Sequence, residues 1–268
     1  MHTVLGVSPR ALEVAAGCTY RTRQIPKLLG GTREVSEPEL PLKRIQRRIA
    51  FWLTRHAAVH PAAHGFVEGH SIVTGARVHA DAGAQSLLAI DLADFFGTIT
   101  VARVAEVLRA TPLAGAMPLV TYHGVLPQGA PSSPIIANLV ARGLDIRLAA
   151  LGYTYTRYAD DLGLSSPRLI TETDRALDAI HAEGFLPAPG KVQLQTTLPP
   201  ANCQHLSLYG LVIAPGRIGI PMARLRRYRR VLQADNTTRE ARGILSFVHM
   251  VYGPVLPSVL RAFEVPHA

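Results

Sequence analysis

Three aspartates stand where their type and spacing could do chemistry. Asp160 and Asp161 are adjacent in an otherwise apolar stretch, TRYADDLGLSSP, and Asp91 ends the apolar run SLLAID. Neighbouring carboxylates repel each other and raise one another's pKa unless a cation neutralises them. Taken alone, an Asp pair is most often a solvated turn, and a single Asp after an apolar run is often a cap or turn residue. The chemistry requires that the chain bring Asp91 beside the pair.

A cluster of this kind would suit Mg²⁺, which takes one or two protein carboxylates and completes its shell with water and substrate phosphates. Two such ions about 3.5–4 Å apart can activate an attacking hydroxyl and stabilise a leaving oxygen in phosphoryl transfer. The chain carries 28 Lys and Arg against 19 Asp and Glu, a net charge of +9. This excess indicates a polyanionic partner, nucleic acid first and an anionic membrane second. A generally Arg-rich proteome is the alternative explanation.

Composition places the chain among globular proteins. Its 268 residues, 48% of them hydrophobic, suffice for one large domain or two small ones. The two cysteines, Cys18 and Cys203, lie far apart without metal-ligand spacing, which favours a reducing compartment. We find no repeat, no signal-peptide pattern and no apolar run long enough to span a bilayer, so we expect a cytoplasmic protein.

In the first half of the chain, the pattern predicts elements around a basic surface. Residues 1–17 are expected to be a short helical lead-in, and residues 20–38 two short strands around Gly30-Gly31. The stretch 41–59 has apolar residues at helical spacing and a basic opposite face. Residues 61–76, rich in Pro and Gly, are expected to form a loop before the strand that carries Asp91.

The second half alternates helices with short strands. Thr100 is expected to cap one helix, and Ser133, followed by Pro134, to cap another. A hairpin should turn at Asp160-Asp161. The remaining expectations are a helix near 170–184, a loop ending at Lys191, a strand pair around 215–216 and helices over 221–268. The order is β-α-loop-α-β-β-α-β, and the three aspartates can meet if their strands are neighbours in one sheet.

An ordered set of motifs carries a family resemblance. The stretches are IPKLLGGTREV, LKRIQRRI, GFVEGHSIVTGARVHA, AIDLADFFGTI, LPQGAPSSPIIANL, RYADDLGLS, GFLPAPGKVQL and LYGLVI. They span roughly residues 20–215, and together they are far more specific than any one of them. The chain resembles a bacterial reverse transcriptase of the retron type, related to the group II intron reverse transcriptases.

The resemblance implies an α+β right-hand polymerase fold with fingers, palm and a short thumb. The fingers would cover 1–80 with the helical lead-in, the palm 81–213 and the thumb 214–268, with 103–125 as a segment that could belong to the fingers side. In the palm, Asp91, Asp160 and Asp161, helped by the backbone carbonyl of Leu92, would hold two Mg²⁺ ions, with Mn²⁺ as a substitute. Lys191 would protonate the pyrophosphate leaving group; an exposed loop lysine is the alternative.

The resemblance also implies contacts to the incoming deoxynucleoside triphosphate. Backbone amides around Asp94 and Phe95 would meet the triphosphate, and Phe96 would be the steric gate that selects deoxynucleotides. One of the two phenylalanines is expected to be core packing instead. Gln128 would lie against the nucleotide, or else stabilise its loop. Lys27 and Arg33 would close over the phosphates, or else form a solvated basic face.

RNA contacts are implied for His79 and for an Arg-rich thumb helix with Arg224, Arg226, Arg227 and Arg230. The alternatives are a satisfied structural histidine and a solvated helix face. The chain departs from the usual retron pattern at two places associated with recognition of the cognate RNA. Gly75 stands where these proteins usually have Asn, and Leu208-Tyr209-Gly210 where they have Val-Thr-Gly.

The function that follows from the resemblance is RNA-dependent DNA synthesis by two-metal nucleotidyl transfer. A structured non-coding RNA would be the template and supply the priming 2′-hydroxyl, and the product would be a short single-stranded DNA. We expect a role in anti-phage defence with a separate effector protein, and no membrane partner. The alternatives are another stand-alone bacterial reverse transcriptase, of the abortive-infection or diversity-generating type, and a catalytically silent RNA-binding scaffold.

Overall fold

The computed structural model describes residues 1–26, 32–199, 201–253 and 260. The helices are α1 (His2–Leu5), α2 (Pro9–Ala16), α3 (Leu40–His56), α4 (Ile72–Asp81), α5 (Val101–Leu108), α6 (Met117–Val120), α7 (Ser133–Val140), α8 (Arg142–Ala149), α9 (Thr173–Ala182), α10 (Met222–Ala234) and α11 (Arg239–Tyr252). The strands are β1 (Tyr20–Pro26), β2 (Thr32–Pro38), β3 (Ser86–Leu92), β4 (Thr154–Tyr158), β5 (Asp161–Ser166), β6 (Pro187–Thr196), β7 (Leu206–Leu208), β8 (Leu211–Ala214) and β9 (Arg217–Gly219). This is a mixed helix and sheet fold, in agreement with the α+β expectation.

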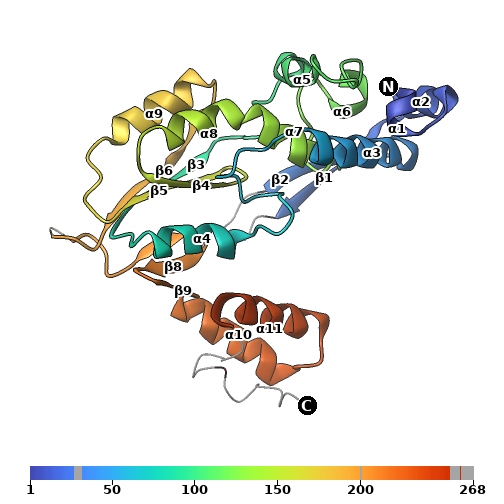
Figure 1. Ribbon diagram of the computed structural model, residues 1–268. Helices are drawn as coiled ribbons and strands as arrows, with labels where there is room; N and C mark the ends of the chain where they lie inside the picture. The colour runs from blue at the N-terminus through green and yellow to red at the C-terminus, as the bar shows by residue number, and fades with distance from the viewer. Residues whose placement is uncertain (27–31, 200, 254–259, 261–268) are drawn as a thin grey trace.

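A four-stranded antiparallel sheet in the order β4-β5-β3-β6 forms the centre of the molecule. Helices α8 and α9 lie over one face, and α4 lies under the other (Figure 1). Because both faces are covered, the central strand β3 is apolar along most of its length, as expected for a strand without a solvent face. Two smaller sheets, β1-β2 and β7-β8-β9, flank this centre.

Two elements were missed in the sequence. The expected loop at 61–76 is wrong beyond residue 71, because α4 begins at Ile72 with a capping box: Ser71 Oγ accepts from the Thr74 amide at 3.2 Å, and Thr74 Oγ1 accepts from the Ser71 amide at 2.8 Å. The expected loop ending at Lys191 is wrong as well, because this lysine lies within β6. Strand β6 pairs with β3 and is an edge strand, where proline is tolerated.

Other boundaries are also corrected. The helix after the Pro/Gly loop is two helices, α7 and α8, and its N-cap is Ser132 rather than Ser133. Thr100 stands at the N-cap of α5 as expected, although its side chain makes no capping bond. The stretch LSLYGLVI is itself a hairpin, so the expected pair around 215–216 is part of a three-stranded sheet.

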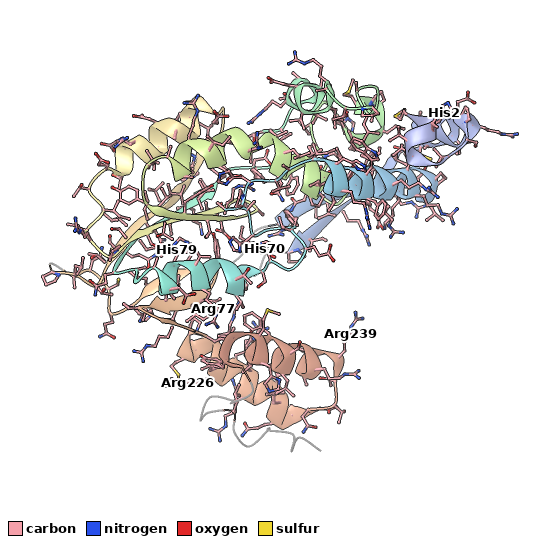
Figure 2. The ribbon with its side chains drawn as sticks, viewed as in Figure 1. His2, His70, Arg77, His79, Arg226 and Arg239 are labelled. Carbon is pink, nitrogen blue, oxygen red and sulfur yellow. The ribbon has the colours of Figure 1, made fainter. Side chains whose placement is uncertain are left out.

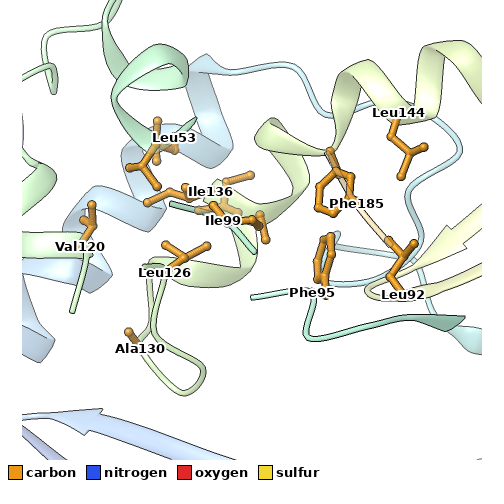
Figure 3. Packing of buried hydrophobic residues seen from close by; sticks show 14 of the residues in the cluster. Leu53, Leu92, Phe95, Ile99, Val120, Leu126, Ala130, Ile136, Leu144 and Phe185 are labelled. Carbon is orange, nitrogen blue, oxygen red and sulfur yellow. The ribbon is translucent and has the colours of Figure 1, made fainter. Parts of the chain in front are cut away.

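Buried side chains form two clusters. The larger joins the N-terminal helices, α5–α9 and one face of the central sheet; Figure 3 shows Phe95 of this cluster beside Leu92 and Phe185. The smaller joins α4 with β7–β9 and the C-terminal helices α10 and α11. Helix α4 therefore links the central sheet to the C-terminal helices. Within the described ranges, no helix is both long enough and apolar enough to cross a bilayer.

Candidate active site

The structure brings Asp91 directly opposite Asp161. Strands β3 and β5 pair antiparallel with these two residues as register partners. The adjacent Asp160 lies in the tight turn between β4 and β5, and its carbonyl accepts the Leu92 amide at 2.9 Å. Ala159 takes a left-handed φ of 58° in this turn. The register of the sheet thus fulfils the condition set by the sequence.

A cavity of about 160 Å³ opens beside this cross-strand pair. Its lining includes Asp91, Asp161, Lys191 and the turn at residues 207–210. Lys191 reaches the cavity from β6, on the other side of β3 from Asp161. Strand pairing on both sides of β3 therefore gathers two carboxylates and one ammonium group in a single hollow.

The electrostatics of the hollow are those of crowded carboxylates. Burial raises the pKa of Asp161 most, the charges of Asp160 and Asp91 raise it further, and Lys191 lowers it, which leaves the pKa at about 7. The carboxylate form is thus disfavoured by its surroundings, and a cation beside it would restore the charged form.

The carboxylates of this site suit a hard cation whose other ligands are water and substrate oxygens. Over the described ranges, no three His, Cys, Asp or Glu side chains are grouped closely enough to hold a metal on their own. Mg²⁺ needs only one or two protein carboxylates and fills its shell with water and phosphate oxygens, so carboxylates at a strand pair and its turn match its requirements.

A buried arginine supports the aspartate turn. Arg157 donates from Nε and Nη2 to the two carboxylate oxygens of Asp145, each at 2.7 Å. Its Nη1 donates to Asn138 Oδ1 at 3.0 Å and to the carbonyl of Ala159 at 3.2 Å. Both charged side chains are completely buried. The guanidinium therefore ties the left-handed turn residue to helices α7 and α8.

The loop at residues 63–66 packs against the same turn. The amide of His64 donates to the carbonyl of Arg157 at 2.7 Å. A Cβ on Gly65 would lie 2.4 Å from the Ala159 amide nitrogen, so only glycine permits this approach. Phe66 follows with a φ of 63° and is 46% exposed. Its ring centroid lies 6.2 Å from that of Phe96 and 6.5 Å from that of Tyr158.

The residues after Asp91 differ sharply in burial. Phe95 is 3% exposed and packs on Phe185 with ring centroids 5.6 Å apart, so its side chain is the core member of the pair. Phe96 is partly exposed and faces Phe66. Asp94 has a φ of 43°, and its carboxylate lies so close to Gly97 that a Cβ there would be 2.1 Å from Oδ2.

Two of the remaining residues expected to contact the nucleotide, Arg33 and Gln128, lie on or against the β1-β2 ribbon. Arg33 is exposed on β2. Gln128 is partly exposed, and its carbonyl accepts the amide of Ser36 on β2 at 2.7 Å. The ribbon and the Pro-Gln-Gly loop are therefore joined. Lys27 lies outside the described residues.

His79 is corrected to a structural histidine. It lies on α4 (Figure 2), is completely buried, and both ring nitrogens are hydrogen bonded, Nδ1 with Ser165 Oγ at 2.6 Å and Nε2 with Thr156 Oγ1 at 2.7 Å. Thr156 is also bonded to the Tyr209 hydroxyl at 2.7 Å. A side chain with no exposed surface and both nitrogens occupied cannot contact RNA, so that expectation is wrong.

The Arg-rich helix α10 presents most of its arginines to solvent. Arg226, Arg227 and Arg230 are exposed, and Figure 2 shows Arg226 on this helix. Arg224 is partly buried; its Nη1 donates to the Gly210 carbonyl at 3.2 Å, and its guanidinium lies 5.9 Å from the Phe247 ring centroid. Three of the four arginines thus remain available for a polyanion.

Sequence reasoning missed Arg157, Asp145, Asn138 and Phe66. One signal was available for Arg157, since a cation within a strand whose neighbours are apolar needs a buried partner. Nothing in the sequence names that partner, because Asp145 sits on a helix whose packing on β4 is a tertiary feature.

Comparison with known proteins then places the chain. The family described as reverse transcriptase (RNA-dependent DNA polymerase) matches residues 25–184, more than half of its length. The retron Ec86 reverse transcriptase of Escherichia coli is 30% identical over 233 residues, which cover 81% of this chain and 71% of that protein. The chain belongs to the retron-type reverse transcriptase family.

Two Myxococcus xanthus proteins are further relatives of this retron-type chain. The retron Mx65 reverse transcriptase is 41% identical over an alignment of 196 residues, and the match covers 62% of this chain. The retron Mx162 reverse transcriptase is 36% identical over an alignment of 222 residues, and the match covers 68% of this chain. The chain spans about half the length of these two proteins, 45% of each.

Proposed function

We propose that this chain is an RNA-dependent DNA polymerase that copies a structured non-coding RNA into a short single-stranded DNA. The observation that carries the proposal is the pairing of Asp91 with Asp161 beside Lys191 in one hollow, within a chain of this family. In a right-hand polymerase fold, residues 1–80 act as the fingers, 81–213 as the palm and 214–268 as a short thumb. The 103–125 segment could belong to the fingers side.

Asp91, Asp160 and Asp161, with the Leu92 carbonyl, would hold two Mg²⁺ ions, for which Mn²⁺ can substitute. When bound, such ions neutralise the charge that develops on phosphate oxygens and favour the ionised hydroxyl. The raised pKa of Asp161 supports this assignment, because the site disfavours its carboxylate without a cation.

The reaction joins the primer hydroxyl to the α-phosphate of a deoxynucleoside triphosphate. The new O–P bond forms as the bond to pyrophosphate breaks, and the hydroxyl proton passes to water. Lys191, which lines the same hollow, donates a proton to the departing pyrophosphate. The first primer is a 2′-hydroxyl of the RNA.

The side chains around the hollow select and hold the nucleotide. Phe96 excludes a ribose 2′-hydroxyl, the backbone amides near Asp94 and Phe95 meet the triphosphate, and Gln128 lies along the nucleotide. Lys27 and Arg33 contact the phosphates, and Arg33 does so from β2, the strand whose Ser36 amide already donates to the Gln128 carbonyl. Exposed Arg226, Arg227 and Arg230 contact the RNA backbone. The product acts in anti-phage defence, together with a separate effector protein.

The test is primer extension on RNA with Mg²⁺. Asp161→Asn keeps the shape of the side chain and removes its charge, and we expect DNA synthesis to fall by about 10³-fold, the equivalent of several kcal/mol of lost charge stabilisation. Asp178→Asn, on the exposed face of α9, is the matched control and should leave the rate unchanged. Undiminished synthesis by the Asp160→Ala, Asp161→Ala double variant would favour the silent scaffold instead.

A further inference from the structure

We propose a second nucleic-acid contact site on helix α3, in which arginines hold phosphates and an aromatic pocket takes a base of single-stranded RNA. This inference rests on the proposed function, because RNA as the bound polymer is taken from it. The surface itself is new and lies away from the carboxylates. The cavity at α3 and the cavity at Asp161 share no lining residue.

The first observation is a row of exposed, positively charged side chains along one face of α3. Arg44, Arg47, Arg48 and Arg55 are exposed and, at a period of 3.6 residues, share one face of α3 with Phe51. The helix contains no acidic residue between its ends. In the described part of the chain, none of the four arginines forms an ion pair with a carboxylate. We define these five residues as the α3 stripe.

The second observation is a pocket at the C-terminal end of this stripe. Residues 3–6, with Arg48, Phe51, Trp52 and His56, line a cavity of about 480 Å³. Arg48 closes one side, because its Nη1 donates to the Leu5 carbonyl at 2.8 Å. A volume of this size admits one planar base with its sugar.

The third observation is the stacking already present at the pocket. Phe51 is 62% exposed, more than any other large hydrophobic side chain in the described ranges, and the Arg55 guanidinium lies 4.5 Å from its ring centroid. Trp52 and His56 stack at 4.4 Å with an interplanar angle of 7°. Rings of this kind beside arginines form the platform on which single-stranded bases stack.

Charge complementarity identifies the occupant. A protein partner would have to supply a strongly acidic surface and also a planar group for the pocket, whereas a polynucleotide supplies both at regular spacing. The phosphates of a single strand bind the arginines of the α3 stripe, and one base enters the pocket between this stripe and α1. We assign the occupant as a single-stranded segment of the RNA partner.

The chain carries its own reporter for this site. It has one tryptophan, Trp52, so tryptophan emission reports on this pocket alone. We expect a ten-nucleotide RNA to quench that emission saturably in a solution that contains neither deoxynucleoside triphosphates nor Mg²⁺. Phe51→Ala should weaken binding by about 5- to 150-fold, the value of one stacked base. An oligonucleotide with abasic positions should bind the parent chain weakly and lose nothing further with Phe51→Ala.

A second experiment tests the arginines by comparing two triple variants that change the net charge by the same amount. Arg44→Glu, Arg47→Glu, Arg55→Glu should lower the slope of log affinity against log salt by about 2, since each phosphate contact to a single strand contributes about 0.7. Arg109→Glu, Arg142→Glu, Arg168→Glu, all exposed and off α3, should keep the slope. Equal losses in both triples would overturn the site and leave only bulk charge.

Two further outcomes decide the occupant. An acidic peptide that quenches Trp52 as well as RNA does would assign the surface to a protein, and a DNA strand of the same sequence that binds as tightly would overturn the assignment to RNA. The Asp160→Asn, Asp161→Asn variant should retain quenching. A failure at α3 can thus be told apart from a failure of the polymerase proposal.

Discussion

Gly75 on α4 and Tyr209 in the β7–β8 turn are in direct contact. A Cβ on Gly75 would lie 2.9 Å from Cε2 of the tyrosine ring, closer than side chains pack. Each belongs to one of the two places at which the sequence is expected to depart from the usual retron pattern, Leu208 being the third changed residue. A missing side chain on α4 is therefore matched by a larger one in the turn, and the two departures form one compensated contact. The Tyr209 hydroxyl then bonds to Thr156 and, through it, to His79.

The contact predicts non-additive stabilities. Gly75→Asn alone forces a side chain into the tyrosine ring, and Tyr209→Thr alone leaves a gap, so each should destabilise the fold by about 1–3 kcal/mol. In the double variant, each change accommodates the other, and we expect a coupling free energy of about 0.5–3 kcal/mol. Urea unfolding of the four proteins, followed by circular dichroism, measures it.

Gly243 on α11 is the control for this cycle, because a Cβ there meets nothing within 4 Å. Gly243→Asn combined with Tyr209→Thr should give additive effects to within about 0.5 kcal/mol. Additivity in the Gly75 cycle as well would mean that the two departures are independent.

The sequence was sufficient to predict the carboxylate pairing because each step is local. An apolar strand ending in Asp91 and a hairpin turning at Asp160-Asp161 are short-range patterns, and only their adjacency needed the sheet. The left-handed Ala159 was not foreseeable from its type, since alanine rarely adopts a positive φ.

The remaining errors come from tertiary context. Helix α4 was hidden by Gly75, which stands in a helix because Tyr209 occupies the space beside it. Strand β6 was hidden by its Pro-Gly composition, which an edge strand tolerates. His79 has both ring nitrogens satisfied by partners 77 and 86 residues away, which spacing along the chain does not reveal.

Breaking the Arg157–Asp145 pair should unfold the centre of the molecule. Arg157→Met leaves the buried Asp145 side chain without its cation and with only the Tyr155 hydroxyl as donor, and we expect a loss of about 3–5 kcal/mol in unfolding free energy. The exposed pair Arg147–Glu183 is the comparison, and Arg147→Met should change stability by about 1 kcal/mol or less.

The positioning role of Arg157 is separable from its effect on stability. Arg157→Met with Asp145→Leu and Tyr155→Phe replaces the pair by apolar groups, removes the Tyr155 hydroxyl that donates to Asp145 at 2.8 Å, and should recover much of the stability. The Ala159 carbonyl would still lack its donor, so the rate of DNA synthesis should remain about 10- to 100-fold low even when the protein is folded. If both the unfolding free energy and the rate of DNA synthesis recovered, Arg157 would have a structural role only.

Acid should destabilise the chain through its buried histidines. Burial, and then the charge of His64, lowers the pKa of His79 to about 4, while the unfolded chain titrates near 6.5. The unfolded state therefore binds more protons between these values, and stability falls as the pH drops from about 6.5 to about 4, by up to about 3 kcal/mol for His79. His64 is lowered to about 4 too, by burial and then the charge of His70.

Urea midpoints measured across this range test the pH dependence. His79→Gln should lower stability near pH 7 and flatten the slope below 6.5, because the titrating ring is gone. His181→Gln, at an exposed position on α9, should leave the slope as it is. An unchanged slope in His79→Gln would assign the acid sensitivity to other groups.

The adjacent phenylalanines should separate selectivity from stability. Phe96 is partly exposed beside Phe66, so Phe96→Ala should admit ribonucleotides and reduce discrimination against them by about 10- to 200-fold, with little effect on folding. Phe95 is 3% exposed against Phe185, so Phe95→Ala should cost about 3–5 kcal/mol in unfolding free energy and leave discrimination unchanged in the protein that stays folded. Competition between labelled ribo- and deoxynucleotides, with urea unfolding of each variant, measures both. A loss of discrimination in Phe95→Ala rather than Phe96→Ala would move the gate to the buried ring, which the packing in Figure 3 opposes.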